Sequence, residues 1–296
     1  TNGWTGPSIR KATSLDSLGF SGGGGGFGKG GGRGWFSGWW GSGGQSGEFR
    51  DPGCAFISAA WARASAGRER NTTRIESESG TRFPGTVYVR EDDERGLQFM
   101  GAGCRSARPW WRLWMPAPQW AAGLYVDARV AAKVAARVAS DADAQRLLTE
   151  PYFAKVVRVV VCKETDAFRF TEVINDNIEV KLAKREGEAL PWLDVWRTWM
   201  CEQGGFKQRF GKGTEIRFIQ LPIDPIGRWM FVTEIRRRNT VVAVKAIENM
   251  DLGWAVLESF LGDRSIAPSF RQDAFASFRA FCKAPLARPA AARSGP

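Results

Sequence analysis

The stretch from Gly80 to Asp127 constrains the fold of this 296-residue chain more than any other segment. It contains three short runs rich in β-branched and aromatic residues, which suit the pleated surface of a sheet. The runs are Thr86 to Arg90, Leu97 to Cys104 and Trp120 to Val126, and the acidic segment Glu91 to Glu94 separates the first two. Short strands with turns between them predict an antiparallel meander.

The second run ends in a cluster of small residues that is followed closely by an arginine. Gly101, Ala102 and Gly103 form the cluster, and Arg105 comes directly after Cys104. An arginine at the end of such a strand can be directed inward, where its fork of donors suits a carboxylate ligand. A structural salt bridge with a nearby carboxylate is the alternative role for Arg105.

The rest of the chain alternates between helical and strand-like patterns. Apolar residues at helical spacing predict helices near residues 130–138, 142–148, 171–182, 190–200, 251–261 and 270–281. Runs of β-branched residues predict strands at 155–162, 214–221, 228–235 and 240–247, with a charged hairpin loop at 236–239. Strands at both ends of the domain, with helices grouped between and after them, predict an α+β fold.

Five pieces of the sequence carry a resemblance to a known family. They are GTRFPGTVYVR, GLQFMGAGCR, AAGLYVD, KGTEIRFIQLP and AIENMDLGWAVLESFLGD, the last followed by SIAP. In this order they resemble the chalcone-isomerase family, and more closely its non-catalytic, fatty-acid-binding branch. The resemblance covers residues 80–282. It implies a large curved antiparallel sheet with helices packed on one face and a ligand cleft between the two layers.

The resemblance also implies a set of site residues. In the enzyme branch, an arginine, a threonine, a tyrosine and an asparagine line the cleft, and these positions match Arg105, Trp120, Phe170 and Asn177 here. Indole and phenyl groups cannot stabilise a developing oxyanion as the two hydroxyls do. We therefore expect no isomerase activity and no catalytic residue. The sequence contains no histidine, which excludes Ser-His-Asp, Cys-His and HExxH chemistry, and it suggests neither a metal nor a cofactor.

In the fatty-acid-binding branch, the arginine and a tyrosine at the position of Trp120 hold the ligand carboxylate. Arg105 is retained, and the indole N–H of Trp120 can still donate one hydrogen bond. Tyr125 offers an alternative hydroxyl, although a strand residue can face either side of the sheet. Three further tryptophans are expected to fill the pocket or to cover it: Trp110, Trp111 and Trp114.

Residues 1–79 are predicted to be a low-complexity N-terminal extension rich in glycine and tryptophan. The glycine tract lacks the spacing of a phosphate-binding loop. Its aromatic residues are predicted to dock on a protein partner or a membrane interface, with docking on the chain's own core as the alternative: Trp35, Phe36, Trp39 and Trp40. The polar run Arg68 to Ser79 is expected to be a loop, so that a domain at 80–282 follows it and a basic tail occupies 283–296.

Charge and cysteine content bear on partners and compartment. The net charge of +11 is spread along the chain, whereas a nucleic-acid footprint needs clustered cations, so nucleic acid is the less favoured partner. The five cysteines are dispersed and odd in number, which favours a reducing compartment, the plastid first and the mitochondrion second.

No apolar stretch reaches the roughly 18 residues of a membrane span. The start at Thr1 fits a mature form whose targeting segment was removed, although a truncated chain would look the same.

Three functions remain open at this level. The first is a non-catalytic chalcone-isomerase-like protein that acts by binding, as an accessory or structural subunit of an organellar complex that could touch a membrane surface. The second is a plastid fatty-acid-binding protein that uses Arg105 for the acyl carboxylate. The third is an RNA-associated subunit of an organellar ribosome.

Overall fold

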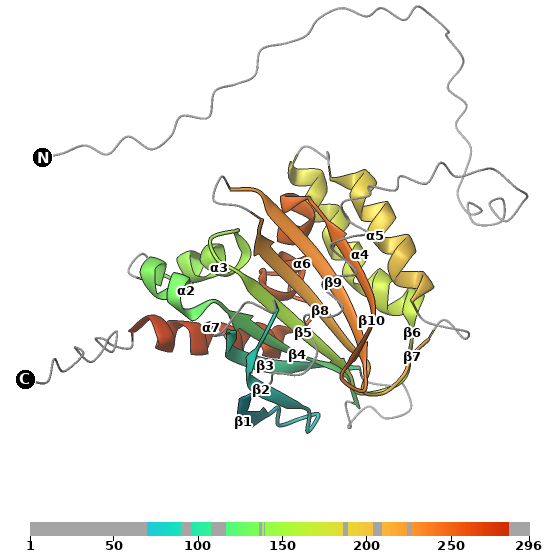
Figure 1. Ribbon diagram of the computed structural model, residues 1–296, viewed down its shortest axis with the longest axis horizontal. Coiled ribbons are helices and arrows are strands. Elements are labelled where there is room, and N and C mark those ends of the chain that lie inside the picture. Colours follow the sequence, from blue (N-terminus) through green and yellow to red (C-terminus); the bar gives the residue numbers. More distant parts are fainter. Residues whose placement is uncertain are drawn as a thin grey trace, which may run out of the picture. The chain divides into compact units, whose positions relative to one another are not determined.

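The computed structural model describes residues 70–89, 96–107, 117–135, 138, 140–185, 189–203, 209–223 and 227–283 (Figure 1). The four aromatic residues expected to dock at 35–40, the tryptophans at 110, 111 and 114, and residues 284–296 of the tail lie outside these ranges. The predicted division into extension, domain and tail therefore stays a prediction.

An antiparallel sheet organises the described residues, as the sequence predicted. In spatial order its strands are β1 (Arg70–Ile75), β2 (Arg82–Val87), β3 (Leu97–Ala107), β4 (Ala117–Val126), β5 (Lys155–Val161), β8 (Glu215–Pro222), β9 (Trp229–Arg237) and β10 (Thr240–Ile247). A separate two-stranded ribbon pairs β6 (Thr165–Asp166) with β7 (Arg209–Phe210). The prediction of an α+β fold with a large antiparallel sheet is confirmed.

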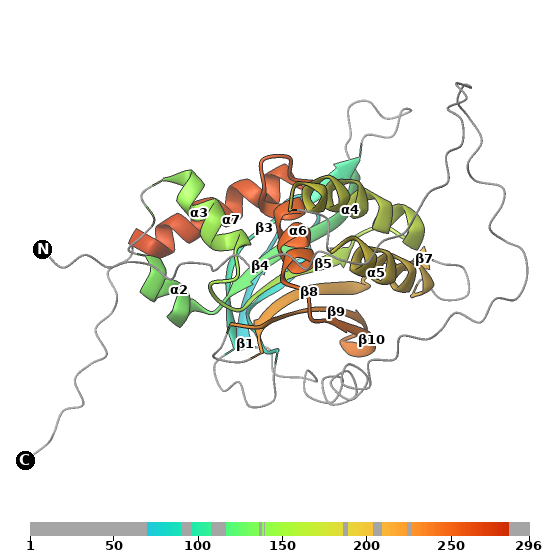
Figure 2. The same ribbon diagram turned by 90° about the horizontal axis from the view of Figure 1, so that it is seen from above.

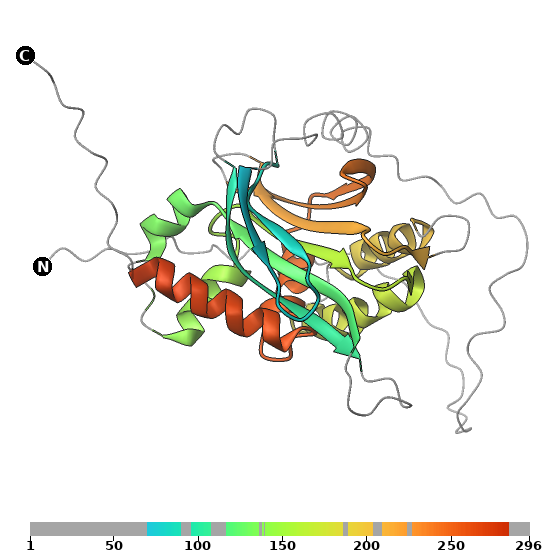
Figure 3. The ribbon, with the colours of Figure 1, turned by 90° about the horizontal axis from the view of Figure 1, so that it is seen from below.

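Helices cover one face of this sheet. They are α2 (Ala128–Ala135), α3 (Asp141–Thr149), α4 (Ala167–Leu182), α5 (Leu190–Glu202), α6 (Met250–Leu261) and α7 (Pro268–Lys283), and a 3₁₀ turn at Ala183–Arg185 follows α4. Figure 2 shows the helices gathered on one side of the strands, and Figure 3 shows the sheet from below, with β1 and β2 folded across it. The main core lies between the helices and alternate residues of the strands, such as Val157, Val159 and Val161 of β5.

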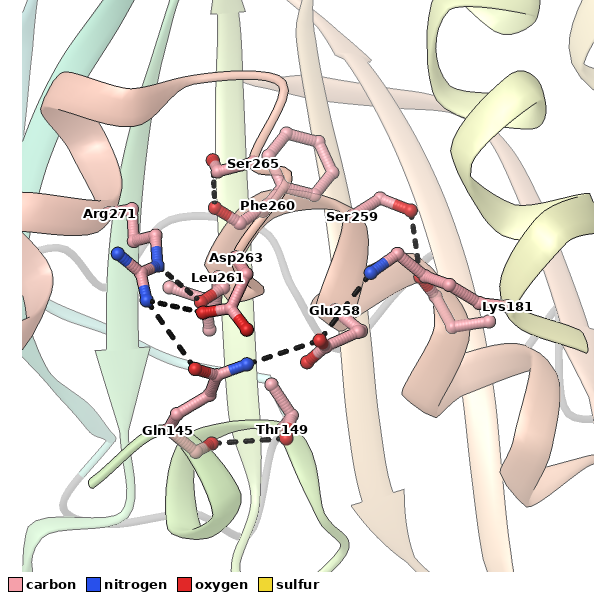
Figure 4. A network of polar contacts seen from close by, with 11 residues as sticks. Gln145, Thr149, Lys181, Glu258, Ser259, Phe260, Leu261, Asp263, Ser265 and Arg271 are labelled. Atoms are coloured by element: carbon pink, nitrogen blue, oxygen red, sulfur yellow. Dashed lines mark hydrogen bonds and ion pairs between the residues drawn. The ribbon is translucent and has the colours of Figure 1, made fainter. Parts of the chain in front are cut away.

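Polar contacts tie the helices to one another over this core (Figure 4). The carboxylate of Glu258 in α6 accepts a hydrogen bond of 3.2 Å from Gln145 of α3 and pairs with Lys181 of α4 at 3.4 Å. Arg271 of α7 donates to the backbone oxygen of Leu261 at 3.1 Å, which satisfies a carbonyl at the end of α6. These contacts join α3, α4 and α7 to α6 above the sheet.

Helix α7 also covers an open edge of the sheet. Within the described ranges, β2 pairs with only two residues of β3, Leu97 and Gln98, and no other described strand lies beside the rest of β3 on that side. Asp273 of α7 accepts a hydrogen bond of 2.9 Å from the N–H of Ala102, and Ser269 donates one of 2.9 Å to the carbonyl of Cys104. The helix thereby protects backbone groups that would otherwise expose an unpaired edge.

The small-residue cluster of β3 is what allows this close approach. A Cβ atom on Gly103 would lie 2.3 Å from the backbone nitrogen of Phe270, and one on Gly101 would lie 2.8 Å from the Cα of Ala274. Side-chain atoms cannot come so close to a backbone, so only glycine fits at these two positions. The glycines thus place α7 directly against the strand that ends in Arg105.

The expectation of a loop over Arg68 to Ser79 is wrong, because residues 70–75 form β1 and pair with β2. The segment looked like a loop because it is polar, but short polar strands are typical of sheet edges, where one side of the backbone faces solvent. Glu76 then fixes the turn that follows, since its carboxylate accepts hydrogen bonds from the N–H groups of Glu78 and Ser79. The sheet therefore begins ten residues before the expected boundary at Gly80.

Candidate functional site

A cleft of about 620 Å³ opens where the ends of β3 and β4 meet the start of α4 and the β6–β7 ribbon. It is lined by Arg105, Gln119, Trp120, Lys163, Glu164, Thr165, Asp166, Arg169, Phe170, Val173 and Arg209. Its volume falls in the range of about 300–1,000 Å³ that is typical of small-molecule sites. The structure thus brings together three of the residues that the sequence singled out: Arg105, Trp120 and Phe170.

Strand register explains how Arg105 and Trp120 reach the same cleft. The two residues are direct partners in the β3–β4 pair, and directly opposed residues on neighbouring strands point to the same face. Phe170 joins them from the first turn of α4. That helix begins four residues earlier than its apolar spacing predicted, because Asp166 caps it by accepting a hydrogen bond of 3.1 Å from the N–H of Arg169.

Arg105 is half-buried at the wall of the cleft. Its Nη1 donates a hydrogen bond of 3.1 Å to the backbone oxygen of Ile266, and burial lowers the pKa of its guanidinium. Within the described ranges, Arg105 forms no ion pair with a carboxylate. A guanidinium carries five N–H donors, so most of its capacity remains available to a ligand. The alternative role, a structural salt bridge, has no partner among these residues.

Aromatic side chains form the floor of the cleft. The ring of Trp120 lies 6.3 Å from that of Phe170 and 5.8 Å from that of Phe260, both in edge-to-face contacts. Phe170 in turn packs edge-to-face on Phe210 at 5.5 Å. Trp120 and Phe170 are each only 3% exposed. The space behind Arg105 is therefore filled by aromatic rings.

Charged residues at the mouth were not singled out by the sequence. Four cations line the cleft, Arg105, Lys163, Arg169 and Arg209, against two carboxylates, Glu164 and Asp166. Arg209 pairs with Glu164 at 2.9 Å. The excess of positive charge favours an anionic ligand. Only the chain reversal through the β6–β7 ribbon brings these residues beside Arg105, and a two-residue strand leaves no periodic signal in the sequence.

Tyr125 and Asn177 do not line the cleft. Tyr125 faces the opposite side of the sheet, where its ring packs on Phe99 at 5.5 Å and burial raises the pKa of its phenol. Asn177 lies two turns along α4 from Phe170, roughly 10 Å at 1.5 Å per residue. Its amide donates to the carbonyl of Val173 at 3.5 Å within the same helix. The structure thus separates both residues from Arg105.

Neither metal nor membrane features accompany the cleft. The residues that the structure describes contain no group of three or more His, Cys, Asp or Glu side chains that could hold a metal ion. None of the helices in those ranges combines the length and the apolar character that crossing a membrane requires.

Comparison with known proteins finds similarity in structure but not in sequence. No protein-family model matches the chain, and no curated protein sequence matches it. The fold is similar to that in the crystal structure of a fatty-acid binding protein from Arabidopsis thaliana, with a TM-score of 0.55. The match covers 71% of this chain and 98% of the Arabidopsis chain, at 14% sequence identity. At this identity the likeness concerns the fold alone.

Proposed function

We propose that this chain is a non-catalytic, chalcone-isomerase-like binding protein whose cleft holds the carboxylate of a fatty acid at Arg105. The observation that carries the proposal is the half-buried guanidinium of Arg105, which forms no ion pair in the described part of the chain and stands over an aromatic floor. An arginine fork suits a carboxylate, and aromatic surface suits an apolar tail. The fold that this chain shares with a fatty-acid binding protein supports the same function.

The composition of the cleft supports binding without catalysis. Trp120 and Phe170 occupy the positions at which the isomerase resemblance implies hydroxyls, and both rings are packed against other aromatic residues. The indole N–H can donate a hydrogen bond, but neither ring can transfer a proton to or from a reacting oxygen at neutral pH. The part of the cleft beside Arg105 is left for binding.

The filled floor also defines which acyl ligand fits. Because Trp120, Phe170 and Phe260 close the space behind Arg105, the tail must lie across the mouth of the cleft, over Val173 and the first turns of α4. A tail in this position keeps part of its surface in water. We therefore propose a short or medium acyl chain as the ligand.

The same filled floor favours a second candidate function, that of an accessory subunit in an organellar complex. In this case the fold serves as a scaffold, and Trp35, Phe36, Trp39 and Trp40 dock on protein neighbours or on a membrane surface. We propose the plastid as the compartment, with the mitochondrion second, which the plant origin of the structural neighbour supports. An RNA-associated subunit remains the third proposal.

Replacing Arg105 by alanine is the direct test of the fatty-acid site. Hydrogen bonds to charged groups contribute about 1.5–3 kcal/mol each, so we expect dodecanoate to bind roughly 10- to 100-fold more weakly to Arg105→Ala. Isothermal titration calorimetry and native mass spectrometry would measure the change. Arg146→Ala is the matched control, because Arg146 is an exposed arginine of α3 outside the cleft.

Two outcomes would count against the fatty-acid site. Equal affinity of dodecanoate for Arg105→Ala and for Arg146→Ala would show that Arg105 does not bind the carboxylate. Failure of the unaltered chain to bind any fatty acid, together with its recovery from its source only within a large particle, would support the scaffold function instead.

A further inference from the structure

The cleft at Arg105 also carries cations on the side formed by the β6–β7 ribbon and α4. Lys163 follows β5, and Arg169 lies in the first turn of α4. Both residues line the cleft, and both are exposed. Arg209 of β7 lines the cleft as well, but its guanidinium pairs with Glu164 at 2.9 Å. The candidates for a second anion-binding point are therefore Lys163 and Arg169.

The two carboxylates that line the cleft are engaged elsewhere. Glu164 forms the ion pair with Arg209. The carboxylate of Asp166 caps α4, where it accepts a hydrogen bond of 3.1 Å from the backbone N–H of Arg169 rather than from its guanidinium. Among the described residues, no ion pair therefore competes with a ligand for the side chains of Lys163 and Arg169.

The aromatic floor lies between these cations and Arg105. Trp120 is the register partner of Arg105 on the sheet, and its ring contacts that of Phe170 in α4 at 6.3 Å. Phe170 directly follows Arg169 in the chain, so α4 brings Arg169 to the cleft from the helix layer. Arg105 and Arg169 thus belong to two different walls of one cleft, the first to the sheet and the second to α4.

The acyl tail of a ligand at Arg105 would lead towards Arg169. The tail lies over Val173 and the first turns of α4, and Val173 follows Arg169 by four residues, so both side chains share one face of the helix. Both of them line the cleft. A methyl group at the far end of the tail would gain nothing from a guanidinium. A carboxylate there would form a charge-assisted hydrogen bond.

We propose that the cleft prefers an α,ω-dicarboxylate to a simple fatty acid, with one carboxylate at Arg105 and the other at Arg169 and Lys163. Such a preference rests on the proposed function, because it requires a carboxylate at Arg105. The four cations that line the cleft exceed its two carboxylates by two charges, which equals the charge of this ligand. A chain that is charged at both ends also suits a tail that keeps part of its surface in water. The placement of the cations on two walls favours charges at the two ends of the ligand over a dianion at one end.

The test is calorimetric titration of the full chain with dodecanedioate and with its monomethyl ester, at neutral pH and constant ionic strength. The two ligands share one length and differ in the charge of one end. Dodecanedioate should bind about fivefold more tightly, which is the gain expected from an exposed ion pair. The double variant Lys163→Gln/Arg169→Gln should lose this preference and still bind dodecanoate. Both side chains are exposed, so the fold should be unaffected.

The matched control is Lys133→Gln/Arg146→Gln, which removes the same charge from exposed positions of α2 and α3 outside the cleft. This control should keep the preference for dodecanedioate. An equal loss of preference in the control and in the Lys163→Gln/Arg169→Gln variant would reveal a general effect of net charge and overturn the assignment.

Further outcomes separate this preference from the fatty-acid site itself. Equal affinity of the unaltered chain for dodecanedioate and for its monomethyl ester would overturn the preference, while binding of dodecanoate that is lost in Arg105→Ala would leave the fatty-acid site in place. Absence of binding of all these ligands would reject both. Tighter binding of dodecyl phosphate than of dodecanedioate would place both charges at the Arg105 end and overturn the role of Arg169 and Lys163.

Discussion

Replacement of Glu215 by glutamine is expected to lower the free energy of unfolding by about 3–5 kcal/mol. Glutamine keeps the shape of the side chain but removes the charge that faces Arg158 and Arg217. Arg158 and Arg217, both buried, would then lose the carboxylate with which each of them pairs. Breaking a buried pair from one side is costly because the remaining charge stays desolvated. Urea denaturation followed by fluorescence would measure the change.

The control for this variant is Glu164→Gln, which removes a carboxylate from an exposed pair. Glu164 and Arg209 also form a salt bridge, at 2.9 Å, but their side chains are 57% and 56% exposed. Exposed pairs contribute about 0–1 kcal/mol, so this control should shift the denaturation midpoint only slightly. Equal losses in the two variants would show that burial of the Glu215 cluster has no energetic consequence.

The pH dependence of stability follows from the same cluster. Burial alone would raise the pKa of Glu215, but Arg217 and Arg158 outweigh burial and lower it from 4.5 to about 2. A lowered pKa in the folded state means that the carboxylate stabilises the fold above pH 4.5, and that this contribution is lost as the pH falls towards 2. At 1.36 kcal/mol per pKa unit, the loss is on the order of 3 kcal/mol. Glu215→Gln should lack this component of the pH dependence. If the unfolding free energies of variant and parent changed with pH in parallel, the pH dependence could not be attributed to Glu215.

The sequence predicted most of the helices and strands, but only some of the residues that line the cleft. Most strands and helices were predictable because β-branched runs and apolar spacing mark them locally. The family resemblance implied that Arg105 and Trp120 line one cleft, and both residues do line the cleft of about 620 Å³. The position of Tyr125 could have been excluded from the sequence itself. It is five residues from Trp120 on one strand, and an odd separation places two strand residues on opposite faces.

The burial of charged residues on β5 and β8 was not predictable from the sequence, for a physical reason. Glu215 and Arg217 alternate with apolar residues along β8, which is the pattern of a strand with one face in solvent. In the structure these two side chains are buried, and β2 covers the neighbouring strand β5 on the same face: Arg158 donates to the backbone oxygen of Arg82 and lies 5.6 Å from the ring of Phe83. Burial of these charges depends on contacts between segments far apart in the chain, which local patterns do not report.

Substitution of Gly103 by alanine is expected to cost about 3 kcal/mol of unfolding free energy, at the upper end of the range for overpacking. The added Cβ would lie 2.3 Å from the backbone nitrogen of Phe270 and 2.5 Å from its Cα, so no side-chain rotation can relieve the clash. Helix α7 would have to move off β3. Its hydrogen bonds to the strand, from Ser269 and to Asp273, would be strained by the same movement.

Gly211→Ala is the matched control, because a Cβ at Gly211 meets nothing within 4 Å. Its free energy of unfolding should stay within about 0.5 kcal/mol of the parent value. The two variants should also differ in ligand binding. Arg105 is anchored to the backbone oxygen of Ile266, two residues before α7 begins, so a displaced helix moves the guanidinium as well. Gly103→Ala should therefore weaken dodecanoate binding while Gly211→Ala leaves it unchanged. If Gly103→Ala instead matched Gly211→Ala in both stability and affinity, the close contact between α7 and β3 would not be what holds Arg105 in place.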